Sequence, residues 1–219
     1  MKPEFRSALA AEFLGTAFLL AAVVGSGIMG ERLANGNAAV ALLANSIATG
    51  AMLAVLIVTF GPLSGAHFNP IVTVVMAYQN GTGRLDVLRY LGAQGSGALV
   101  GVGCANVMFG LPLFSFSQHI RSGGAQVFSE FIATFGLLMV ILVCRKFRQA
   151  SLPFVVGGYI TAAYWFTAST SFANPAVTLA RALTDTFSGI RPADVPLFIL
   201  AQVCGGACAV LVFRPKGAI

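Results

Sequence analysis

Two asparagine–proline pairs are the residues of this sequence whose type and setting most suggest chemistry. Asn69-Pro70 and Asn174-Pro175 each begin a short apolar segment. Asparagine is a good N-cap and proline suits the first position of a helix, so each pair predicts a helix start. A helix N-terminus carries about +0.5 charge, and an asparagine amide donates hydrogen bonds. The residues at the two predicted starts are Asn69, Pro70, Ile71, Asn174, Pro175 and Ala176.

Two carboxylates, Glu12 and Glu130, lie inside apolar stretches. Carboxylates at membrane depth are candidates for function by default, and a proton relay is one interpretation. Gln94 and Gln202 are candidates for hydrogen bonds between helices, and His67 is a group that can titrate. No nucleophile with a base stands out, so we predict no catalytic residue and no enzyme.

Long apolar segments are the elements that would position these residues. A spanning helix needs about 20 mostly apolar residues, and the sequence predicts six such spans: 8–29, 39–60, 87–109, 126–144, 152–170 and 195–213. The first could instead be a signal peptide, but it lacks a clear small-residue cleavage site and its Glu12 has a counterpart later. Segments 70–79 and 175–183 are too short to span, and short helices at membrane depth line a cavity or are buried in protein.

The composition is that of a membrane protein. Of the residues, 57% are hydrophobic and 9% are charged, against about 25% charged in a typical soluble domain. The net charge of +6 does not indicate nucleic acid, because the basic residues stand at the ends of apolar runs and suit membrane orientation. The four cysteines lie in apolar stretches, so we predict no disulfide. Cys204 and Cys208 share a helix face, and small packed residues explain them better than a soft-metal site.

The two halves of the chain repeat. Residues 11–16 match 129–134, residues 69–73 match 174–178, and Gln94 matches Gln202. Each half, about 1–118 and 119–219, holds three full spans, so the second half must be inverted relative to the first. The two short helices then enter from opposite faces and meet near the midplane, where inverted-repeat proteins place their solute site. We therefore predict one transmembrane channel domain over 1–219.

The basic residues predict the orientation. With both termini in the cytoplasm, nine of the 13 Lys and Arg residues fall on the cytoplasmic side, which is a positive-inside bias. These nine are Lys2, Arg6, Arg84, Arg89, Arg145, Lys146, Arg148, Arg214 and Lys216. The other four fall on the outer side of the membrane or near that side: Arg32, Arg121, Arg181 and Arg191. We expect a multi-pass protein of a cell membrane, the inner membrane of a bacterium.

At this point the sequence resembles the aquaporins, also called major intrinsic proteins. The resemblance covers nearly the whole chain and rests on Ser-Gly-Ala-His-Phe-Asn-Pro at 64–70, Asn-Pro-Ala at 174–176, and the paired Glu12 and Glu130. It implies an all-α bundle of six transmembrane helices plus two half-helices, one pore per protomer, and a homotetramer. A channel for small neutral solutes across the lipid bilayer is the function it implies. The sequence has no nucleotide motif or coupling machinery, so we expect passive transport without cofactor, metal or nucleic acid. Structural support of the loops before the half-helices is the role the resemblance implies for Glu12, Glu130, His67, Gln94 and Gln202.

The family has a narrow filter of four positions outside the midplane. Counting from the two Asn-Pro motifs places them at Thr49, Ala162, Ser171 and Val177. Water-selective relatives have a large aromatic, a histidine, a small residue and an arginine there, and glycerol-conducting relatives have aromatics and keep the arginine. Val177 replaces that arginine here. Arg181 is four residues further along its helix, about 6 Å along the axis, and we expect it to lie beyond the filter.

These four residues predict a wide opening with two hydroxyls, two apolar surfaces, no aromatic ring and no charge. Glycerol-like polyols and water should pass. Such filters look like those of bacterial aquaglyceroporins associated with arsenic resistance, which implies arsenous acid or methylated arsenicals as further solutes. Ile71 stands where the first motif usually has alanine, and we expect it to narrow or shift the midplane constriction.

Three other functions remain open from the sequence. A plain water or glycerol facilitator is the first, and comparison of water, glycerol and metalloid uptake would separate it. A small-anion channel is the second, although it needs a basic or donor-rich constriction and the four filter positions supply only two hydroxyls. A membrane enzyme is the third and has no catalytic arrangement to support it.

Overall fold

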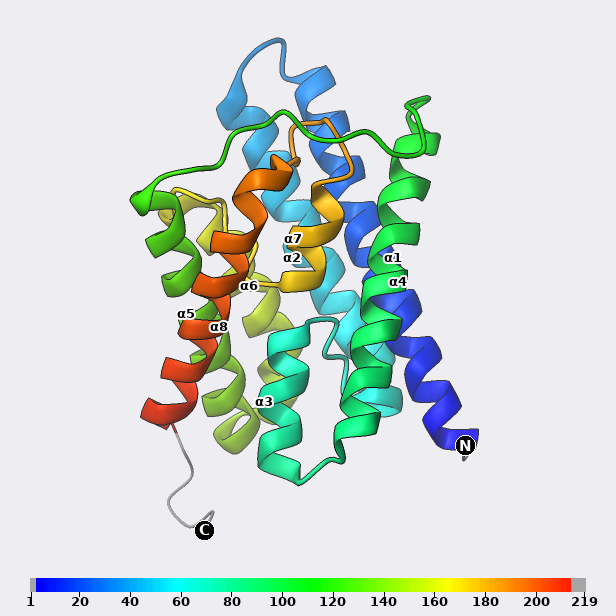
Figure 1. Ribbon diagram of the computed structural model, residues 1–219, viewed down its shortest axis with the longest axis vertical. Coiled ribbons are helices and arrows are strands. Elements are labelled where there is room, and N and C mark those ends of the chain that lie inside the picture. The colour runs from blue at the N-terminus through cyan, green and yellow to red at the C-terminus, as the bar shows by residue number, and fades with distance from the viewer. Residues whose placement is uncertain (1–2, 214–219) are drawn as a thin grey trace.

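The computed structural model describes residues 3–213, which form helices joined by loops and contain no strand. The six long helices are α1 (Pro3–Leu33), α2 (Ala38–Ser64), α4 (Arg84–Met108), α5 (Gly124–Phe147), α6 (Leu152–Phe166) and α8 (Val195–Phe213). Two short helices are α3 (Pro70–Asn80) and α7 (Pro175–Arg181), and two 3-10 turns are η1 (Gln149–Ser151) and η2 (Pro192–Asp194) (Figure 1). This is the predicted all-α bundle of six long helices and two half-helices.

Most helix positions agree with the prediction. The half-helices begin at the predicted prolines, and α8 has the predicted bounds of 195–213. Four stretches of the described helices are long and apolar enough to cross a membrane: Glu4–Leu33, Ala38–Ser64, Gly124–Phe147 and Pro192–Phe213. Helix α4 has sufficient length, 25 residues, but its first two turns contain Arg84, Asp86 and Arg89.

The predicted ends of α6 and α7 are wrong. Helix α6 stops at Phe166 rather than at 170, and its 15 residues reach about 22 Å. The chain then leaves the helical conformation because tertiary contacts hold the next segment as an irregular loop, in which Thr170, Ser171 and Ala173 have positive φ. Helix α7 stops at Arg181 rather than at 183, since the Arg181 carbonyl accepts a bond from the amide of Ile190 in the loop that follows.

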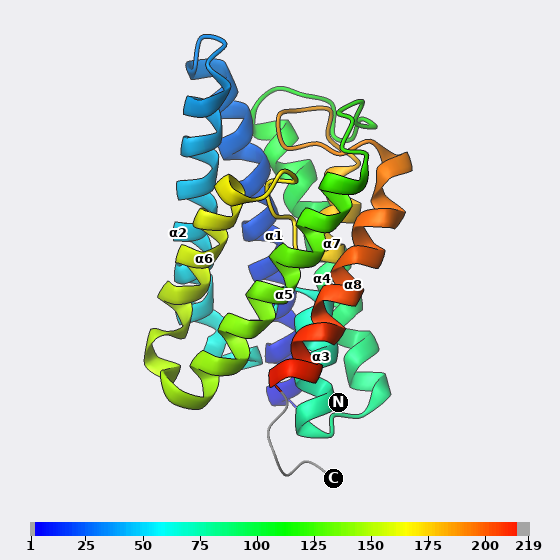
Figure 2. The same cartoon turned by 90° about the vertical axis from the view of Figure 1, so that its left-hand side faces the viewer.

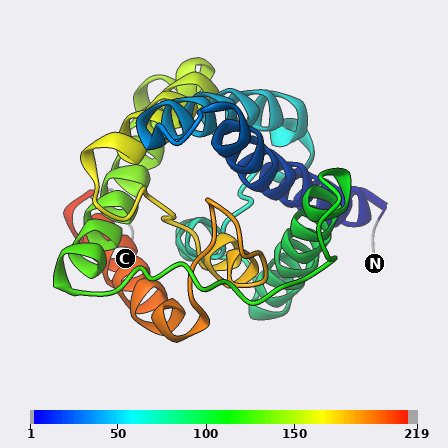
Figure 3. The ribbon, with the colours of Figure 1, turned by 90° about the horizontal axis from the view of Figure 1, so that it is seen from above.

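The long helices surround the two half-helices. Seen from above, α3 and α7 lie inside a ring formed by the other six (Figure 3). Within the first half α1 packs on α2 and α4, within the second half α5 packs on α6 and α8, and α2 packs on α6 across the halves (Figure 2). Helix α3 enters from the end that carries the N-terminus of α1, and α7 enters from the opposite end (Figure 1). Their first residues meet in the middle, as expected for an inverted repeat.

Glycines at matched positions permit the closest helix contacts. A Cβ added to Gly97 of α4 would stand 2.2 Å from the Phe13 carbonyl oxygen of α1. A Cβ added to Gly205 of α8 would stand 2.4 Å from the Phe131 carbonyl oxygen of α5. Each contact follows directly after a buried glutamate, so the glycines bring the two carboxylate-bearing helices against their partners. Small residues at such crossings are typical of helix packing in membranes.

Substitution of Gly97 by alanine is expected to destabilise the bundle. The new methyl group meets backbone, which cannot rotate away, so α1 and α4 must separate, at a cost of about 1–3 kcal/mol. The measurement is thermal unfolding of the detergent-purified protein. Gly95→Ala is the matched control in the same helix, because nothing lies within 4 Å of a Cβ there. Equal melting temperatures for the two variants would contradict the packing argument.

Both ends of the described chain lie at the same end of the bundle as the turn between α3 and α4 (Figure 1). That turn leads into Arg84, and α5 brings Arg145 and Lys146 in its last turn. Arg32 lies in the last turn of α1, at the opposite end of the bundle. Of the basic residues used for the predicted orientation, Lys2, Arg214 and Lys216 lie outside the described residues.

Candidate pore

A cavity of about 620 Å³ lies inside the ring of helices. Its wall includes Phe5 and Arg145 near one end, Asn69 and Asn174 at the junction of the half-helices, and Arg181 at the end of α7. We call its two ends the Arg145 end and the Arg181 end. The cavity therefore follows both half-helices through the place where they meet.

The two asparagines cap their half-helices and also tie the halves together. The Asn69 side-chain oxygen accepts from the amide of Ile71, and that of Asn174 accepts from the amide of Ala176. Asn69 Nδ2 donates to the Ala173 carbonyl at 2.8 Å, and Asn174 Nδ2 donates to the Phe68 carbonyl at 2.7 Å. An amide nitrogen carries two hydrogens, so each asparagine keeps one donor for the cavity that it lines.

The other four predicted pore-centre residues do not line the cavity as the described residues form it. Pro70, Ile71, Pro175 and Ala176 are absent from its lining. The Ile71 side chain packs on Gly206 of α8, where its Cγ2 atom takes the space that a Cβ would occupy. The expected effect of Ile71 on the constriction is therefore indirect, through the position of α3 against α8.

The loops that precede the half-helices share an uncommon backbone conformation. Ala66 and Phe68 have φ of 51° and 48°, and Ser171 and Ala173 have φ of 51° and 49°. These residues stand three and one positions before each asparagine. Left-handed conformations at residues other than glycine cost about 1–3 kcal/mol each, and they persist where the surroundings hold them. Both loops must therefore be fixed from outside.

Glu12 holds the first loop. It is fully buried, and its Oε1 atom accepts from the Ser64 hydroxyl at 2.7 Å and the His67 amide at 2.9 Å. Its Oε2 atom accepts from the Phe68 amide at 2.8 Å and Gln94 Nε2 at 2.7 Å. Four donors therefore surround one carboxylate.

Glu130 holds the second loop in the same way. It is fully buried and accepts from the Phe172 amide at 2.8 Å and the Ala173 amide at 2.9 Å, one on each oxygen. Gln202 Nε2 donates to it at 2.6 Å. Among the described residues neither glutamate lines the cavity. That position favours the structural role implied by the resemblance over a proton relay.

Glutamine in place of Glu130 is expected to lower the melting temperature. Both carboxylate oxygens accept backbone N–H groups, so the new amide nitrogen must face a donor, at a cost of about 1–3 kcal/mol. The measurement is thermal unfolding in detergent, together with solute uptake as a function of pH. Glu31→Gln on the exposed end of α1 is the control. An unchanged melting temperature with loss of a pH-driven flux would support the proton relay instead.

The remaining supporting residues bind around these carboxylates. Gln94 Nε2 also donates to Thr73 of α3, and Gln202 Nε2 also donates to Thr178 of α7. His67 Nδ1 lies 3.2 Å from the Thr73 hydroxyl, and its ring lies 5.6 Å from that of Tyr90. His67 also lines the cavity, where a solute can reach it. Its role in supporting the loop therefore stays a prediction.

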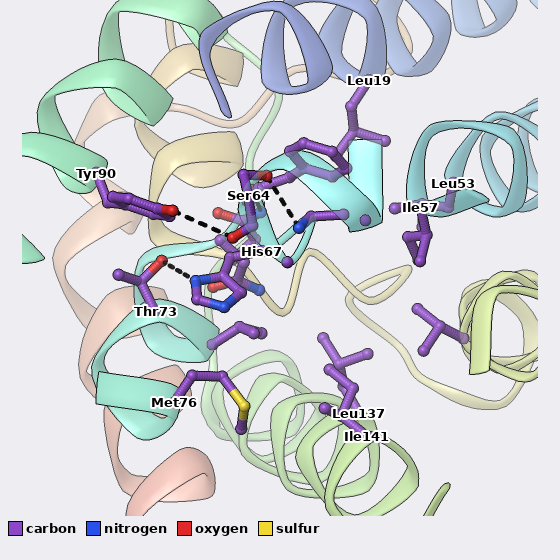
Figure 4. Close-up of a pocket in the computed structure, with 18 of the residues that line it drawn as sticks. Leu19, Leu53, Ile57, Ser64, His67, Thr73, Met76, Tyr90, Leu137 and Ile141 are labelled. Carbon is purple, nitrogen blue, oxygen red and sulfur yellow. Dashed lines mark hydrogen bonds between the residues drawn. The ribbon is translucent and has the colours of Figure 1, made fainter. Parts of the chain in front are cut away.

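The cavity has one apolar side and one polar side. Leu53 and Ile57 of α2 and Leu137 and Ile141 of α5 recur every four residues and face the cavity (Figure 4). Opposite them the close-up shows the side chains of Ser64, His67, Thr73 and Tyr90, with Tyr90 bonded to the Ser64 carbonyl and His67 to Thr73 (Figure 4). This amphipathic surface suits a solute with carbon on one side and hydroxyls on the other.

Three of the four predicted filter residues face the cavity. Thr49, Ser171 and Val177 are buried and line the cavity. The Ser171 hydroxyl has no hydrogen-bond partner in the described part of the chain. Ala162 does not join them, because it is exposed on α6 and is absent from the cavity wall.

Tyr164 takes the place predicted for Ala162. Helix α6 lines the cavity with Val156, Ile160 and Tyr164, which are four residues apart and share one face. Ala162 is two residues from Ile160, about 200° around the helix, and must face outward. The Tyr164 hydroxyl lies 3.3 Å from the Thr49 hydroxyl. The 3.6-residue period of α6 indicates which of its residues share the cavity face, and counting from the motif did not use it.

Arg181 also reaches the cavity, although its backbone lies further along α7 than that of Val177. Arg181 lines the same cavity as Val177 and is buried, with 1% of its surface exposed. Its guanidinium carbon lies 3.4 Å from the centre of the Phe172 ring, and its Nε atom donates to the Ser188 carbonyl. The wall at this end therefore contains an aromatic ring from Tyr164 and a cation, which the four-residue filter lacked.

Comparison with known proteins places this arrangement in a family. Residues 1–160 match the family described as major intrinsic protein. The chain is 54% identical over 204 residues to aquaglyceroporin AqpS of Rhizobium meliloti, which covers 93% of this chain and 87% of that protein. It is 29% identical over 225 residues to nodulin-26 of Glycine max, covering 96% and 78% of the two chains.

A solved structure has the same fold. The aquaglyceroporin from Plasmodium falciparum superposes with a TM-score of 0.74 at 23% identity, covering 98% of this chain and 97% of that one. The family match over most of the chain, the close relative and the paired half-helices agree with one another. This chain is therefore a membrane channel of the major intrinsic protein, or aquaporin, family.

Proposed function

We propose that this chain is a passive channel for small neutral solutes, conducting water and glycerol-like polyols. The observation that carries the proposal is the cavity wall at the half-helix junction, where Asn69 and Asn174 each keep an amide donor. Both donors stand at positively polarised helix ends, which disfavours cations. A solute oxygen can bind there while its carbon atoms contact the apolar side.

Bulkier neutral solutes form the second part of the proposal. Val177 stands in the wall where family members usually carry an arginine, and valine leaves more room. Arsenous acid is uncharged at neutral pH and resembles a small polyol, so it fits an opening of this kind. Methylated arsenicals are larger and depend more strongly on that room. We propose both as solutes.

The assembly and its place complete the proposal. We expect a homotetramer in a bacterial inner membrane, with both termini in the cytoplasm. The close relative is bacterial, and the described basic residues at the Arg145 end agree with the positive-inside rule. Light scattering of the purified protein, and protease access to a C-terminal tag in inverted vesicles, test these two points.

Stopped-flow uptake by proteoliposomes tests the function. Shrinkage and reswelling are recorded for water, glycerol, arsenous acid and a methylated arsenical, with empty liposomes as the control. We expect faster water and glycerol movement than in empty liposomes and measurable uptake of both arsenicals. Water and glycerol transport without any arsenical uptake would indicate a plain facilitator, and no transport of any neutral solute would overturn the proposal.

A further inference from the structure

Arg181 is a buried cation at the wall of the cavity, and the sequence motif does not account for it. Its side chain is fully enclosed apart from 1% of its surface. The described residues contain two salt bridges, Arg89–Asp86 and Arg191–Asp194, and neither includes Arg181. A buried guanidinium without a carboxylate is costly unless it is bound by other groups or faces water. What holds Arg181 therefore indicates what it is for.

Two contacts hold the base of the guanidinium and leave its ends free. The group lies over the Phe172 ring at 3.4 Å, a short cation–π distance, and Nε donates to the Ser188 carbonyl. Ser188 is itself fixed to the Val23 carbonyl of α1. The terminal nitrogens of Arg181 make no hydrogen bond within the described residues, although their side chain lines the cavity. Their donors are thus available to a solute.

The direction of the side chain places this charge near the filter. Cα–Cβ bonds of a helix tilt toward its N-terminus, so a long side chain at the end of α7 lies back over the preceding turn. Phe172 stands directly after Ser171 and two residues before Asn174, and the guanidinium rests on its ring. Arg181 therefore returns its positive charge to the level of Ser171 and Val177, although its backbone is about 6 Å further along the axis.

Arg121 also contacts the Phe172 ring, and its hydrogen bonds are those of a purely structural residue. Arg121 lies 5.1 Å from the Phe172 centroid and donates to the Ser169, Gly189 and Phe187 carbonyls. Its nitrogens are used by loop backbone, and among the described residues it is absent from the cavity wall. Arg181 differs from Arg121 in both respects.

We propose that Arg181 is a selectivity-determining residue that supplies the fixed positive charge and hydrogen-bond donors of this end of the pore in place of an arginine at position 177. Together with the unpartnered hydroxyl of Ser171, it forms a subsite for hydroxyl oxygens of neutral solutes. Because the guanidinium lies over the Phe172 ring, it charges the wall without crossing the opening. The inference rests on the proposed function and adds a cation barrier to it.

Three variants test the charge. Arg181→Gln keeps a donor for the Ser188 carbonyl but is neutral, Arg181→Met removes donor and charge, and Arg181→Lys keeps the charge. Arg32→Met is the control, since Arg32 lies at the exposed end of α1 and is absent from the cavity lining. Proteoliposomes are assayed for glycerol uptake and for K⁺ and Cl⁻ leak, with protein amount and melting temperature recorded for each variant.

We expect K⁺ leak to rise about tenfold or more in the glutamine and methionine variants, without an equal rise in Cl⁻ leak. The lysine variant and the control should keep K⁺ leak near the wild-type level. Equal rises for both ions would indicate a loosened bundle and overturn the proposal, as would unchanged leak or failure of both neutral variants to fold. Absence of glycerol uptake in the wild type would refute the proposed function separately.

Discussion

Val177→Arg is expected to reduce uptake of glycerol and bulkier neutral solutes by about tenfold or more, equivalent to about 1.4 kcal/mol of added barrier, while largely sparing water. Valine is short, and the cavity wall beside it already holds Arg181 on the next turn of α7. That guanidinium occupies the face of Phe172, and like charges repel. A new arginine must therefore project across the opening, where it obstructs large solutes and offers donors to water.

Val177→Met is the matched control for this prediction, because methionine adds length without charge. It should reduce bulky-solute uptake less than arginine does, since it is flexible and cannot be held rigid by hydrogen bonds. Thr49→Phe should act in the same direction as arginine from the facing wall, by filling space beside Tyr164. Paired stopped-flow uptake of water and a methylated arsenical gives the ratio. Equal loss of both solutes would indicate misfolding, and no loss of either would place the filter elsewhere.

The parts of the fold that local chemistry determines were predictable from the sequence. Both half-helices begin at the predicted prolines because an asparagine cap and a proline at the first position act within a few residues. The repeat also predicted that Glu12 and Glu130 have equivalent positions, and in the structure each carboxylate binds the loop before a half-helix. The Asn-Pro capping motif and the internal repeat are both properties of the linear sequence, so they can be recognised without a structure.

The parts that depend on side-chain reach were not predictable from the same counting. Ala162 was placed by its distance from a motif, but the loop after Phe166 is irregular and α6 instead presents Tyr164 to the cavity. Arg181 was placed by its backbone, whereas its guanidinium rests on the ring of Phe172 in the loop before α7. Phe172, whose ring contacts Arg181, lies in a loop whose conformation is fixed by Glu130 of α5. Such a contact depends on packing between distant segments, which motif spacing does not contain.

Asn69→Asp and Asn174→Asp are expected to damage both the fold and the ion barrier, and together they test the half-helix junction. Aspartate remains a good N-cap, so the bonds to Ile71 and Ala176 should survive. The bond across the halves is lost, because a carboxylate cannot donate to the Ala173 or Phe68 carbonyl and must face it instead. A donor lost from a buried pair costs about 1–3 kcal/mol, and the melting temperature should fall accordingly.

The ion barrier should change at the same time, because each variant places a negative charge where two positively polarised helix ends meet. We expect K⁺ and proton leak to rise in whatever protein folds, and glycerol uptake to fall as the amide donors are lost. Asn80→Asp is the matched control, since Asn80 lines the same cavity at the other end of α3 and gains the same charge away from any helix N-terminus. A leak that rises equally in Asn80→Asp would show that negative charge anywhere in the cavity admits cations. Wild-type leak and stability in both junction variants would show that the cation barrier does not lie between Asn69 and Asn174.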